Sequence, residues 1–135
     1  MATLKLEIVT PEAQTYSDDV EMVTLPAVEG EMGVYPQHVP LVTQIVAGEV
    51  IVRKDGQDSF LAVGEGFVEI TGNRVAVMTD MAISAENIDE AKAEEARHRA
   101  EARLAEQLDD VDAAAVSASL AHSLAQLKVK RRQRT

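Results

Sequence analysis

Residues 29–43 read EGEMGVYPQHVPLVT, and this stretch gathers residues that shape the backbone. It holds two of the chain's seven glycines and two of its four prolines. Gly30 and Gly33 can adopt positive φ without strain, while Pro36 and Pro40 fix φ and remove backbone donors. We therefore predict one shaped loop, which either closes a β-sandwich as a plain connection or presents a surface on a rigid scaffold.

The sequence around this loop, from residue 1 to residue 84, predicts short strands. Apolar and polar side chains alternate in residues 4–8, and alternating or fully apolar runs recur at 20–25, 41–46, 49–53, 59–63, 66–70 and 74–79. Alternation with a period of two is typical of strands. Asp55-Gly56 and Gly72-Asn73 lie between such runs and indicate hairpin turns. About eight to ten short strands at this spacing predict a sandwich or a flattened barrel.

After Ser84 the composition changes from that of strands and turns to that of helices. Every glycine, proline and aromatic residue lies at or before position 72, and the remainder is rich in alanine. We therefore predict an α+β protein with two domains. An independently folding β domain should occupy residues 1–84, and a helical domain should occupy residues 85–135.

The helical domain is expected to form a hairpin of two helices. Asn87 is the predicted N-cap of the first helix, with the side chain of Glu90 reaching back to it. The apolar stripe of this helix comprises Ala93, Ala96, Ala100, Leu104 and Leu108. Because the acidic run 109–112 interrupts the pattern, the first helix should end near Gln107 and the second should begin near Ala113.

The second helix is expected to have two usable faces. It has no formally charged residue between Ala113 and Leu127. One face comprises Ala113, Val116, Leu120, Leu124 and Leu127, and the opposite face comprises Ala114, Ala118, Ala121 and Ala125. This pattern indicates either a helix of high intrinsic propensity or a helix that exchanges partners.

Composition and charge argue against several classes of function. The net charge is −10, and an acidic body is unsuited to nucleic-acid binding. Cysteine is absent, which excludes disulfides and thiolate metal sites. His38, His98 and His122 have no metal-ligand spacing, and no phosphate-binding or nucleophile motif is present. We expect no metal, no cofactor and no catalytic residue. The start of the chain, MATLKLEIV, has a charge inside its apolar stretch and predicts neither a signal peptide nor a membrane span.

The order of motifs in residues 29–43 resembles the signature of the epsilon subunit of F-type ATP synthases. That signature contains an acidic-Gly pair, an aliphatic-Gly pair, Pro, His and Pro-Leu, which correspond here to Glu29-Gly30, Met32-Gly33, Pro36, His38 and Pro40-Leu41. One position departs from it, because Gln37 stands where the family usually has glycine. The resemblance continues through Gly66-Phe67-Val68-Glu69 and Ile88-Asp89 to the last helix, and so covers nearly the whole chain.

This resemblance implies a non-catalytic rotor subunit. A β-sandwich of two sheets would attach to the gamma subunit and the c-ring and couple proton flow to ATP synthesis. The helical hairpin would contact the alpha/beta catalytic hexamer and inhibit ATP hydrolysis. The protein would lie at the cytoplasmic face of the bacterial plasma membrane as a peripheral subunit, held there only through the complex. The expected rotor-interface residues are Glu29, Gly30, Glu31, Gly33, Tyr35, Pro36 and His38.

A regulatory ATP site is implied less completely. Some epsilon subunits bind ATP with an Ile/Leu-Asp-x-x-Arg-Ala motif and further basic residues, which correspond here to Ile88, Asp89, Lys92, Ala93 and Arg99. Lys92 keeps the charge of the motif arginine but lacks its planar fork. The two basic positions expected on the second helix are occupied by His122 and Gln126. ATP is therefore expected to be, at most, a weak regulatory ligand.

The end of the chain is strongly basic, and its cations are Lys128, Lys130, Arg131, Arg132 and Arg134. Basic residues complement the negative end of a helix dipole, but five exceed that need. By the resemblance, they would engage acidic segments of the catalytic head, since the chain's own acidic remainder is expected to offer only diffuse partners. Two alternatives belong to other classes. One is a small β-sandwich enzyme that uses His38 and nearby carboxylates as acid and base, and the other is an acidic scaffold with a basic nucleic-acid-binding tail.

Overall fold

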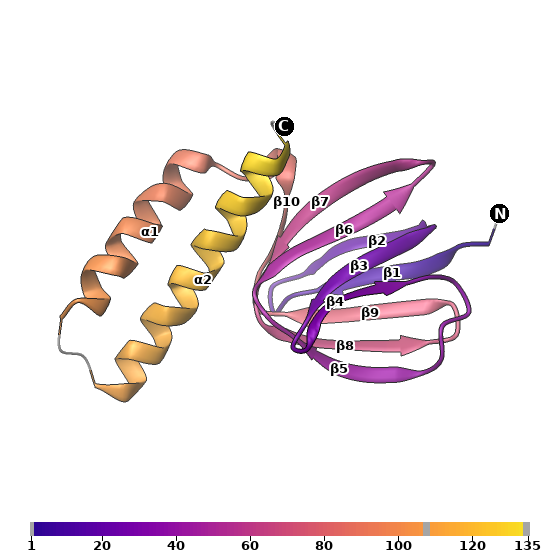
Figure 1. Cartoon of the computed structure of the whole chain (residues 1–135), viewed down its shortest axis with the longest axis horizontal. Helices are drawn as coiled ribbons and strands as arrows, with labels where there is room; N and C mark the ends of the chain where they lie inside the picture. The colour runs from indigo at the N-terminus through magenta and orange to yellow at the C-terminus, as the bar shows by residue number, and fades with distance from the viewer. Residues whose placement is uncertain (1, 107–108, 134–135) are drawn as a thin grey trace.

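The computed structural model describes residues 2–106 and 109–133 (Figure 1). Within these residues the strands come first and the helices follow. The strands are β1 (Leu4–Val9), β2 (Gln14–Val20), β3 (Met22–Ala27), β4 (Gly30–Val34), β5 (Leu41–Ile45), β6 (Gly48–Lys54), β7 (Gln57–Val63), β8 (Gly66–Thr71), β9 (Arg74–Thr79) and β10 (Ala82–Ser84). The helices are the short 3-10 helix η1 (Ala85–Asn87), α1 (Glu90–Leu104) and α2 (Asp110–Gln133).

The strands form a sandwich whose two layers belong to one continuous, nearly closed sheet. Hydrogen bonds connect them in the order β10-β7-β6-β3-β5-β8-β9-β1-β2, and β4 pairs with β3. The layers meet where β3 and β5 share the single pair Ala27 and Ile45. Lys54 of β6 donates a hydrogen bond to Asp18 of β2, which brings the far end of the sheet back to the first layer. The predicted sandwich is therefore confirmed (Figure 1).

The space between the layers is filled by aliphatic side chains that alternate along the strands. Leu4, Leu6 and Ile8 of β1 are at most 1% exposed, as the period of two predicts. Other strands contribute side chains in the same way, among them Val23, Leu25, Val50, Val52, Val68, Ile70, Val75 and Val77. Burial of each such side chain stabilises the fold by about 1.5–3 kcal/mol.

Both predicted hairpin turns are present. Asp55 and Gly56 join β6 to β7 with φ of 53° and 75°, which are the two positive values that a type I′ turn requires. Gly72 has a φ of 51° in the turn between β8 and β9.

The prediction of a single loop over residues 29–43 is wrong. Val28 and Glu29 form the turn of a β3–β4 hairpin, and Gly30 after them has a φ of 128°. Gly33 is not in a loop but in β4, where it pairs with Thr24 without positive φ. Its neighbour Val34 is fully buried, so strand pairing and core burial override the flexibility of glycine. Apart from this turn, only residues 35–40 of the stretch lie outside strands.

The helices form the predicted hairpin, but their ends differ from the expectation. Asp89, not Asn87, is the N-cap of α1, and its Oδ1 accepts a hydrogen bond from the Lys92 backbone N–H at 3.1 Å. Asn87 instead ends η1. The first helix ends at Leu104, before the expected Gln107, and α2 begins at Asp110 rather than Ala113. The acidic run 109–112 explains this early start, because Asp109 accepts from the Asp112 N–H at 2.8 Å and caps the helix.

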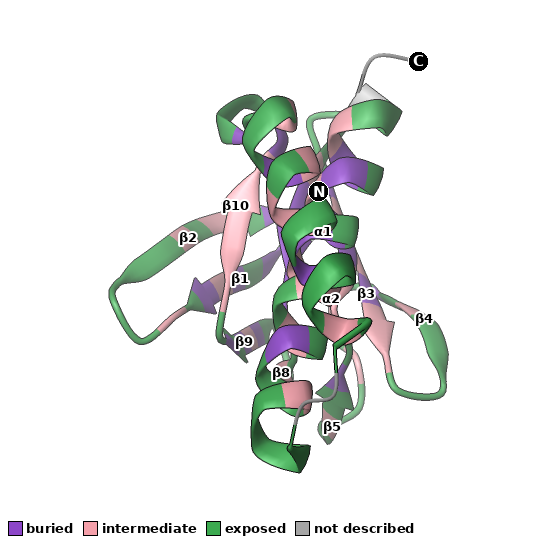
Figure 2. Cartoon of the chain, turned by 90° about the vertical axis from the view of Figure 1, so that its left-hand side faces the viewer, coloured by how far each residue is buried: buried purple, intermediate pink, exposed green. Residues whose placement is uncertain are grey.

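Helix α2 lies between α1 and the sandwich and is buried on two sides (Figures 1 and 2). On one side, Ala125 and Val129 form a second hydrophobic cluster with Ala62 of β7 and with Ala85 and Ile88. Elsewhere on α2 the buried residues are Val116, Ser123 and Leu127. Each of the two predicted faces is thus partly covered, through Val116 and Leu127 on one and Ala125 on the other. Leu124 was expected within one face but is 46% exposed, because Ser123 takes the inward position. Leu108, expected in the stripe of α1, lies outside the described residues.

Candidate functional sites

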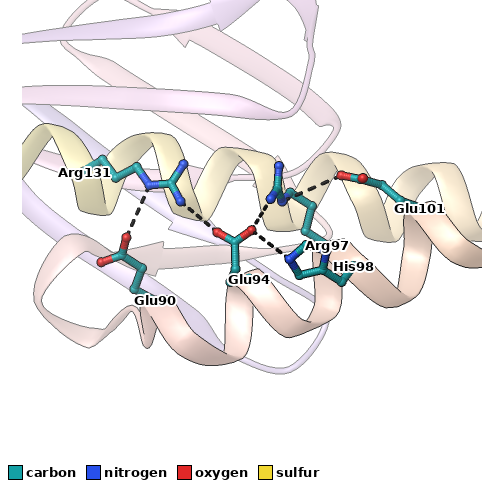
Figure 3. A network of polar contacts seen from close by, with 6 residues as sticks. All are labelled: Glu90, Glu94, Arg97, His98, Glu101 and Arg131. Atoms are coloured by element: carbon teal, nitrogen blue, oxygen red, sulfur yellow. Dashed lines mark hydrogen bonds and ion pairs between the residues drawn. The ribbon is translucent and has the colours of Figure 1, made fainter.

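Glu94 of α1 is the centre of an ion-pair network that joins the two helices (Figure 3). Arg131 of α2 lies with its Nη2 2.7 Å from Glu94 Oε2 and with its Nε 3.3 Å from Glu90 Oε1. Arg97 and His98 contact the other carboxylate oxygen of Glu94. Burial raises the pKa of Glu94, but the hydrogen bond from Arg97 and the surrounding positive charges outweigh burial and hold that pKa below its usual value. The carboxylate is therefore the favoured form in the folded hairpin.

The end of α2 also contacts the sandwich, through an ion pair with a buried carboxylate. Arg132 Nε lies 3.0 Å from Oε1 of Glu49, whose side chain on β6 is only 4% exposed. The Arg132 guanidinium also lies over the Phe60 ring, 5.5 Å from its centre. Glu49 Oε2 has no hydrogen-bond partner among the described residues. The charge of Glu49 is therefore compensated mainly by α2.

The prediction that the basic end has only diffuse partners within the chain is wrong. Arg131 and Arg132 are held by specific carboxylates, and Lys130 donates to the backbone oxygen of Ala85 at 3.1 Å. Lys128 is exposed. Arg134 lies outside the described residues. Sequence could not identify these partners, because Glu49, Glu90 and Glu94 are brought to the end of α2 only by tertiary folding.

The residues of the ATP motif lie in different environments along α1 and just before it. Ile88 and Ala93 are buried in apolar contacts, and Asp89 is engaged as the cap of α1. Lys92 and Arg99 are exposed, and Asp89 and Arg99 are ten residues apart, which corresponds to about 15 Å along a helix.

The two α2 positions of the ATP pattern instead contact the sandwich. His122 Nε2 lies 3.1 Å from Asp80 Oδ1, and Gln126 Nε2 lies 3.8 Å from the Met81 sulfur. Gly64 makes the first contact possible, since a Cβ there would collide with the Asp80 carboxylate. In the folded chain both side chains are thus engaged with residues that follow β9.

The expected rotor-interface residues fall into two groups at opposite ends of β4. Glu29, Gly30 and Glu31 lie at the β3–β4 turn and are exposed. The second group comprises Tyr35, which is 59% exposed, with Pro36 and His38, while Gly33 lies within the strand between the groups.

The irregular segment at residues 35–40 is fixed by local contacts. Gln37 has a φ of 66°, and its N–H donates to Asn73 Oδ1 at 2.8 Å. The ring Nδ1 of His38 lies 2.7 Å from the backbone oxygen of Val39. The segment is therefore fastened to the β8–β9 turn, with Tyr35 projecting from its start.

An apolar row on the outer surface of the sandwich was not predicted. Phe67 of β8 pairs with Met78 of β9, which pairs in turn with Val9 of β1, and these side chains are 50%, 48% and 37% exposed. Val28 and Val46, which are 54% and 41% exposed, lie beside Phe67 around a cavity of 420 Å³. We call these five residues the apolar row. The available sequence signal was limited to Val9, Phe67 and Met78, which are large apolar residues at outward positions of their strands, since Val28 and Val46 lie just beyond β3 and β5.

Among the described residues we find no further arrangement typical of a metal or catalytic site. No group of three or more His, Asp or Glu among them is arranged to hold a metal ion. The described helices include none with the length and apolarity needed to cross a membrane.

Two family descriptions match successive parts of the chain. The beta-sandwich domain of the ATP synthase delta/epsilon chain matches residues 3–85, and its long alpha-helix domain matches residues 86–131. The chain belongs to the delta/epsilon family of ATP synthase subunits. The resemblance found in the sequence is thus confirmed. Subunits of this family are regulatory and structural rather than catalytic, so the alternative of an enzyme based on His38 is wrong.

The chain is similar in sequence to individual ATP synthase epsilon chains over most of their length. The ATP synthase epsilon chain of Halorhodospira halophila is 42% identical over 130 residues, which span 95% of this chain and 92% of the relative. That of Bacillus subtilis is 44% identical over 112 residues, spanning 83% and 85% of the two chains.

Solved ATP synthases contain chains of the same fold. A chain of the Euglena gracilis mitochondrial ATP synthase has a TM-score of 0.78 at 24% identity, covering 95% of this chain and 81% of that one. A chain from the central stalk and c-ring structure of the Tetrahymena thermophila mitochondrial enzyme has a TM-score of 0.64 at 11% identity, covering 99% and 98%.

Proposed function

We propose that this chain is a rotor subunit that links the gamma subunit to the c-ring and thereby couples proton flow to ATP synthesis. The observation that carries the proposal is the apolar row. Contiguous exposed apolar side chains are characteristic of protein interfaces, and here Phe67, Met78 and Val9 lie on the rigid strands β8, β9 and β1. The Tetrahymena chain of the same fold comes from a structure of the central stalk and c-ring, which is consistent with a rotor partner for this surface.

The two groups of expected interface residues support contacts with two partners. Val28 belongs to the apolar row, and Glu29, Gly30 and Glu31 follow it directly along the chain, so we assign this group to the same interface. Tyr35 and Pro36 line a separate cavity of 430 Å³ with Met22 and Arg53. We assign this cavity, with the adjacent His38, to the other rotor partner. The chain would then sit peripherally at the cytoplasmic face of the plasma membrane, held through the complex.

Assembly on membranes tests this proposal. The double variant Phe67→Glu/Met78→Glu places two charges in the apolar row and should lower the amount of chain retained with gamma and the c-ring by about tenfold or more, because each buried unpaired charge opposes association. Val111→Glu/Leu124→Glu is the matched control, since these exposed apolar residues lie on α2. Normal retention of the Phe67/Met78 variant would refute the assignment of the interface.

We also infer that the helical hairpin restrains ATP hydrolysis when it opens. In the folded hairpin Arg131 and Arg132 are held by Glu90, Glu94 and Glu49. Opening would free these cations to engage acidic segments of the alpha/beta hexamer.

ATP itself is proposed to be no more than a weak ligand of the hairpin, because Lys92 lacks the planar fork of the motif arginine and the two basic positions expected on α2 are occupied by His122 and Gln126. Titration of ATP against thermal unfolding of the full chain tests this, since a ligand that binds only the native state must raise its stability. A rise of several degrees at 1 mM ATP, about 2 kcal/mol or more in a domain of this size, would show a tight site instead.

A further inference from the structure

Two arginines on α1 differ from those at the end of α2 in having no partner within residues 2–106 and 109–133. Among the described residues, the side chains of Arg99 and Arg103 have no hydrogen bond or ion pair, whereas Arg131 and Arg132 are held by carboxylates. Being four residues apart, Arg99 and Arg103 lie on one side of α1, one turn apart. Unpaired neighbouring arginines are notable in a chain with a net charge of −10.

These arginines flank a groove between the two helices. The groove has a volume of 410 Å³ and is lined by Ala96, Arg99, Ala100 and Arg103 of α1 with Ala115, Val116 and Ser119 of α2. Apart from the two guanidinium groups and one hydroxyl, its lining side chains are apolar, and none of the carboxylates in the described part of the chain lines it. The groove therefore combines a floor of small side chains with a positive rim.

The dimensions of the groove suit a third helix. Alanine at the floor allows another helix to approach within the 8–10 Å typical of helix packing. One helical turn separates Arg99 from Arg103, about 6 Å along the axis, and this spacing equals that of carboxylates four residues apart on a facing helix. The planar guanidinium fork can bind each carboxylate through two parallel hydrogen bonds.

We propose that the α1–α2 groove docks an acidic amphipathic helix of a protein partner. Carboxylates at positions i and i+4 of that helix would pair with Arg99 and Arg103, and its apolar side chains would rest on Ala96, Ala100 and Ala115. The surface is complete in the folded hairpin. It therefore goes beyond the proposed inhibition, which needs the hairpin to open, and either proposal can fail without the other.

Binding of a designed probe tests the inference. The probe is a fluorescent helical peptide with glutamates at i and i+4 beside a leucine and alanine face, and its binding to the full chain is measured by anisotropy. We expect saturable binding that weakens about tenfold in Arg99→Gln/Arg103→Gln, as estimated for two partly exposed ion pairs. A probe with glutamine in place of glutamate should bind the unmodified chain about as weakly.

Matched variants separate the groove from general charge attraction. Lys92→Gln/Lys128→Gln removes the same charge from two exposed positions outside the groove and should leave binding unchanged. Ala115→Trp fills the groove from an exposed position and should abolish binding while the circular dichroism melt is preserved. Amide NMR shifts on probe binding should concentrate in residues 96–103 and 115–119.

Three outcomes would overturn the inference. Equal weakening by the Lys92/Lys128 control would show nonspecific charge attraction. Amide shifts confined to the sandwich would place the peptide elsewhere. Failure of the peptide to bind, combined with Arg99- and Arg103-dependent stabilisation by ATP or dodecanoate, would assign the groove to a small anion.

Discussion

Gln37 holds a backbone conformation that favours glycine. Its φ of 66° lies in the left-handed region, where a residue with a Cβ carries a cost of about 1–2 kcal/mol. The hydrogen bond from its N–H to the side chain of Asn73 fixes this conformation. The rest of the connection from β4 to β5 is thereby held in place from the β8–β9 turn.

Substitution at Gln37 should therefore follow the tolerance for positive φ. We expect Gln37→Gly to raise the free energy of unfolding by about 0.5 kcal/mol, because part of the relieved strain is offset by greater freedom of the unfolded chain. Gln37→Val should lower it by about 1–2 kcal/mol, because a β-branched side chain is disfavoured there. Urea unfolding measures both. Equal stability of all three proteins would show that the strain is relaxed in solution.

The buried carboxylate of Glu49 depends on Arg132 for its charge partner. Arg132→Leu leaves its buried carboxylate without its partner and should destabilise the fold by about 1–3 kcal/mol. Glu49→Leu/Arg132→Leu should recover most of that loss, because an apolar pair needs no compensation. Chemical denaturation of the two variants, with Lys128→Leu as an exposed control, gives the comparison. A double variant less stable than Arg132→Leu would contradict the buried-charge explanation.

At the scale of elements, the contact between α1 and α2 depends on the ionisation of Glu94, because its carboxylate pairs with Arg131. Because its pKa in the folded chain is lowered from a usual value of 4.5, its stabilising effect is complete above that usual value. The effect is lost as the pH falls through the lower folded pKa. Acidification should thus weaken the contact with Arg131 and not strengthen it.

Thermal melts of Glu94→Gln against pH test this dependence. At pH 7 the variant should melt a few degrees below the unmodified chain, a shift ordinary for a modest contact in a small domain, and the difference should shrink below about pH 4.5. Glu95→Gln is the control, since Glu95 is exposed on the same helix. A Tm difference that is constant from pH 7 to pH 3 would mean that the charge of Glu94 is not responsible.

Sequence predicted the elements with strong periodicity and missed those defined by their neighbours. β1 and the hairpins at Asp55-Gly56 and Gly72-Asn73 were predicted because alternation and turn chemistry are local. β2 reads QTYSDDV and is largely exposed at the end of the sheet, so it lacks an apolar signature. β4 was hidden by its glycines, and its identity as a strand comes from pairing with β3.

Over the whole molecule, the surfaces available for function depend on contacts between distant segments. The apolar row joins residues of β1, β8 and β9 with the turns beside β3 and β5, so no local pattern shows it. The basic residues at the end of α2 could be read from the sequence, but the carboxylates that pair with Arg131 and Arg132 could not. Arg132, which lies 83 positions after Glu49 in the chain, reaches it only because α2 lies against β6 and β7.

The ion pairs that hold Arg131 and Arg132 lead to a prediction for ATP hydrolysis by the assembled complex. Glu90→Gln/Glu94→Gln loosens the hairpin while keeping every cation of the tail, so it should increase inhibition relative to the unmodified complex. Changing Lys128, Lys130, Arg131, Arg132 and Arg134 together to Gln should decrease inhibition, as should deletion of residues 88–135. Rising salt should also weaken inhibition, because exposed charges are screened beyond about 8 Å at physiological ionic strength.

The opposite effects of these two sets of variants are the decisive readout. ATP hydrolysis is measured across a salt series, with Glu95→Gln/Glu106→Gln as a control that removes two exposed carboxylates from outside the network. If Glu90→Gln/Glu94→Gln left the rate unchanged, the ion pairs would not govern release of the tail. Equal rates with and without residues 88–135 would show that the hairpin does not inhibit. Inhibition that persisted through both high salt and the five Gln changes would have its cause in apolar packing of α2, whose uncharged faces would then be the regulatory surface.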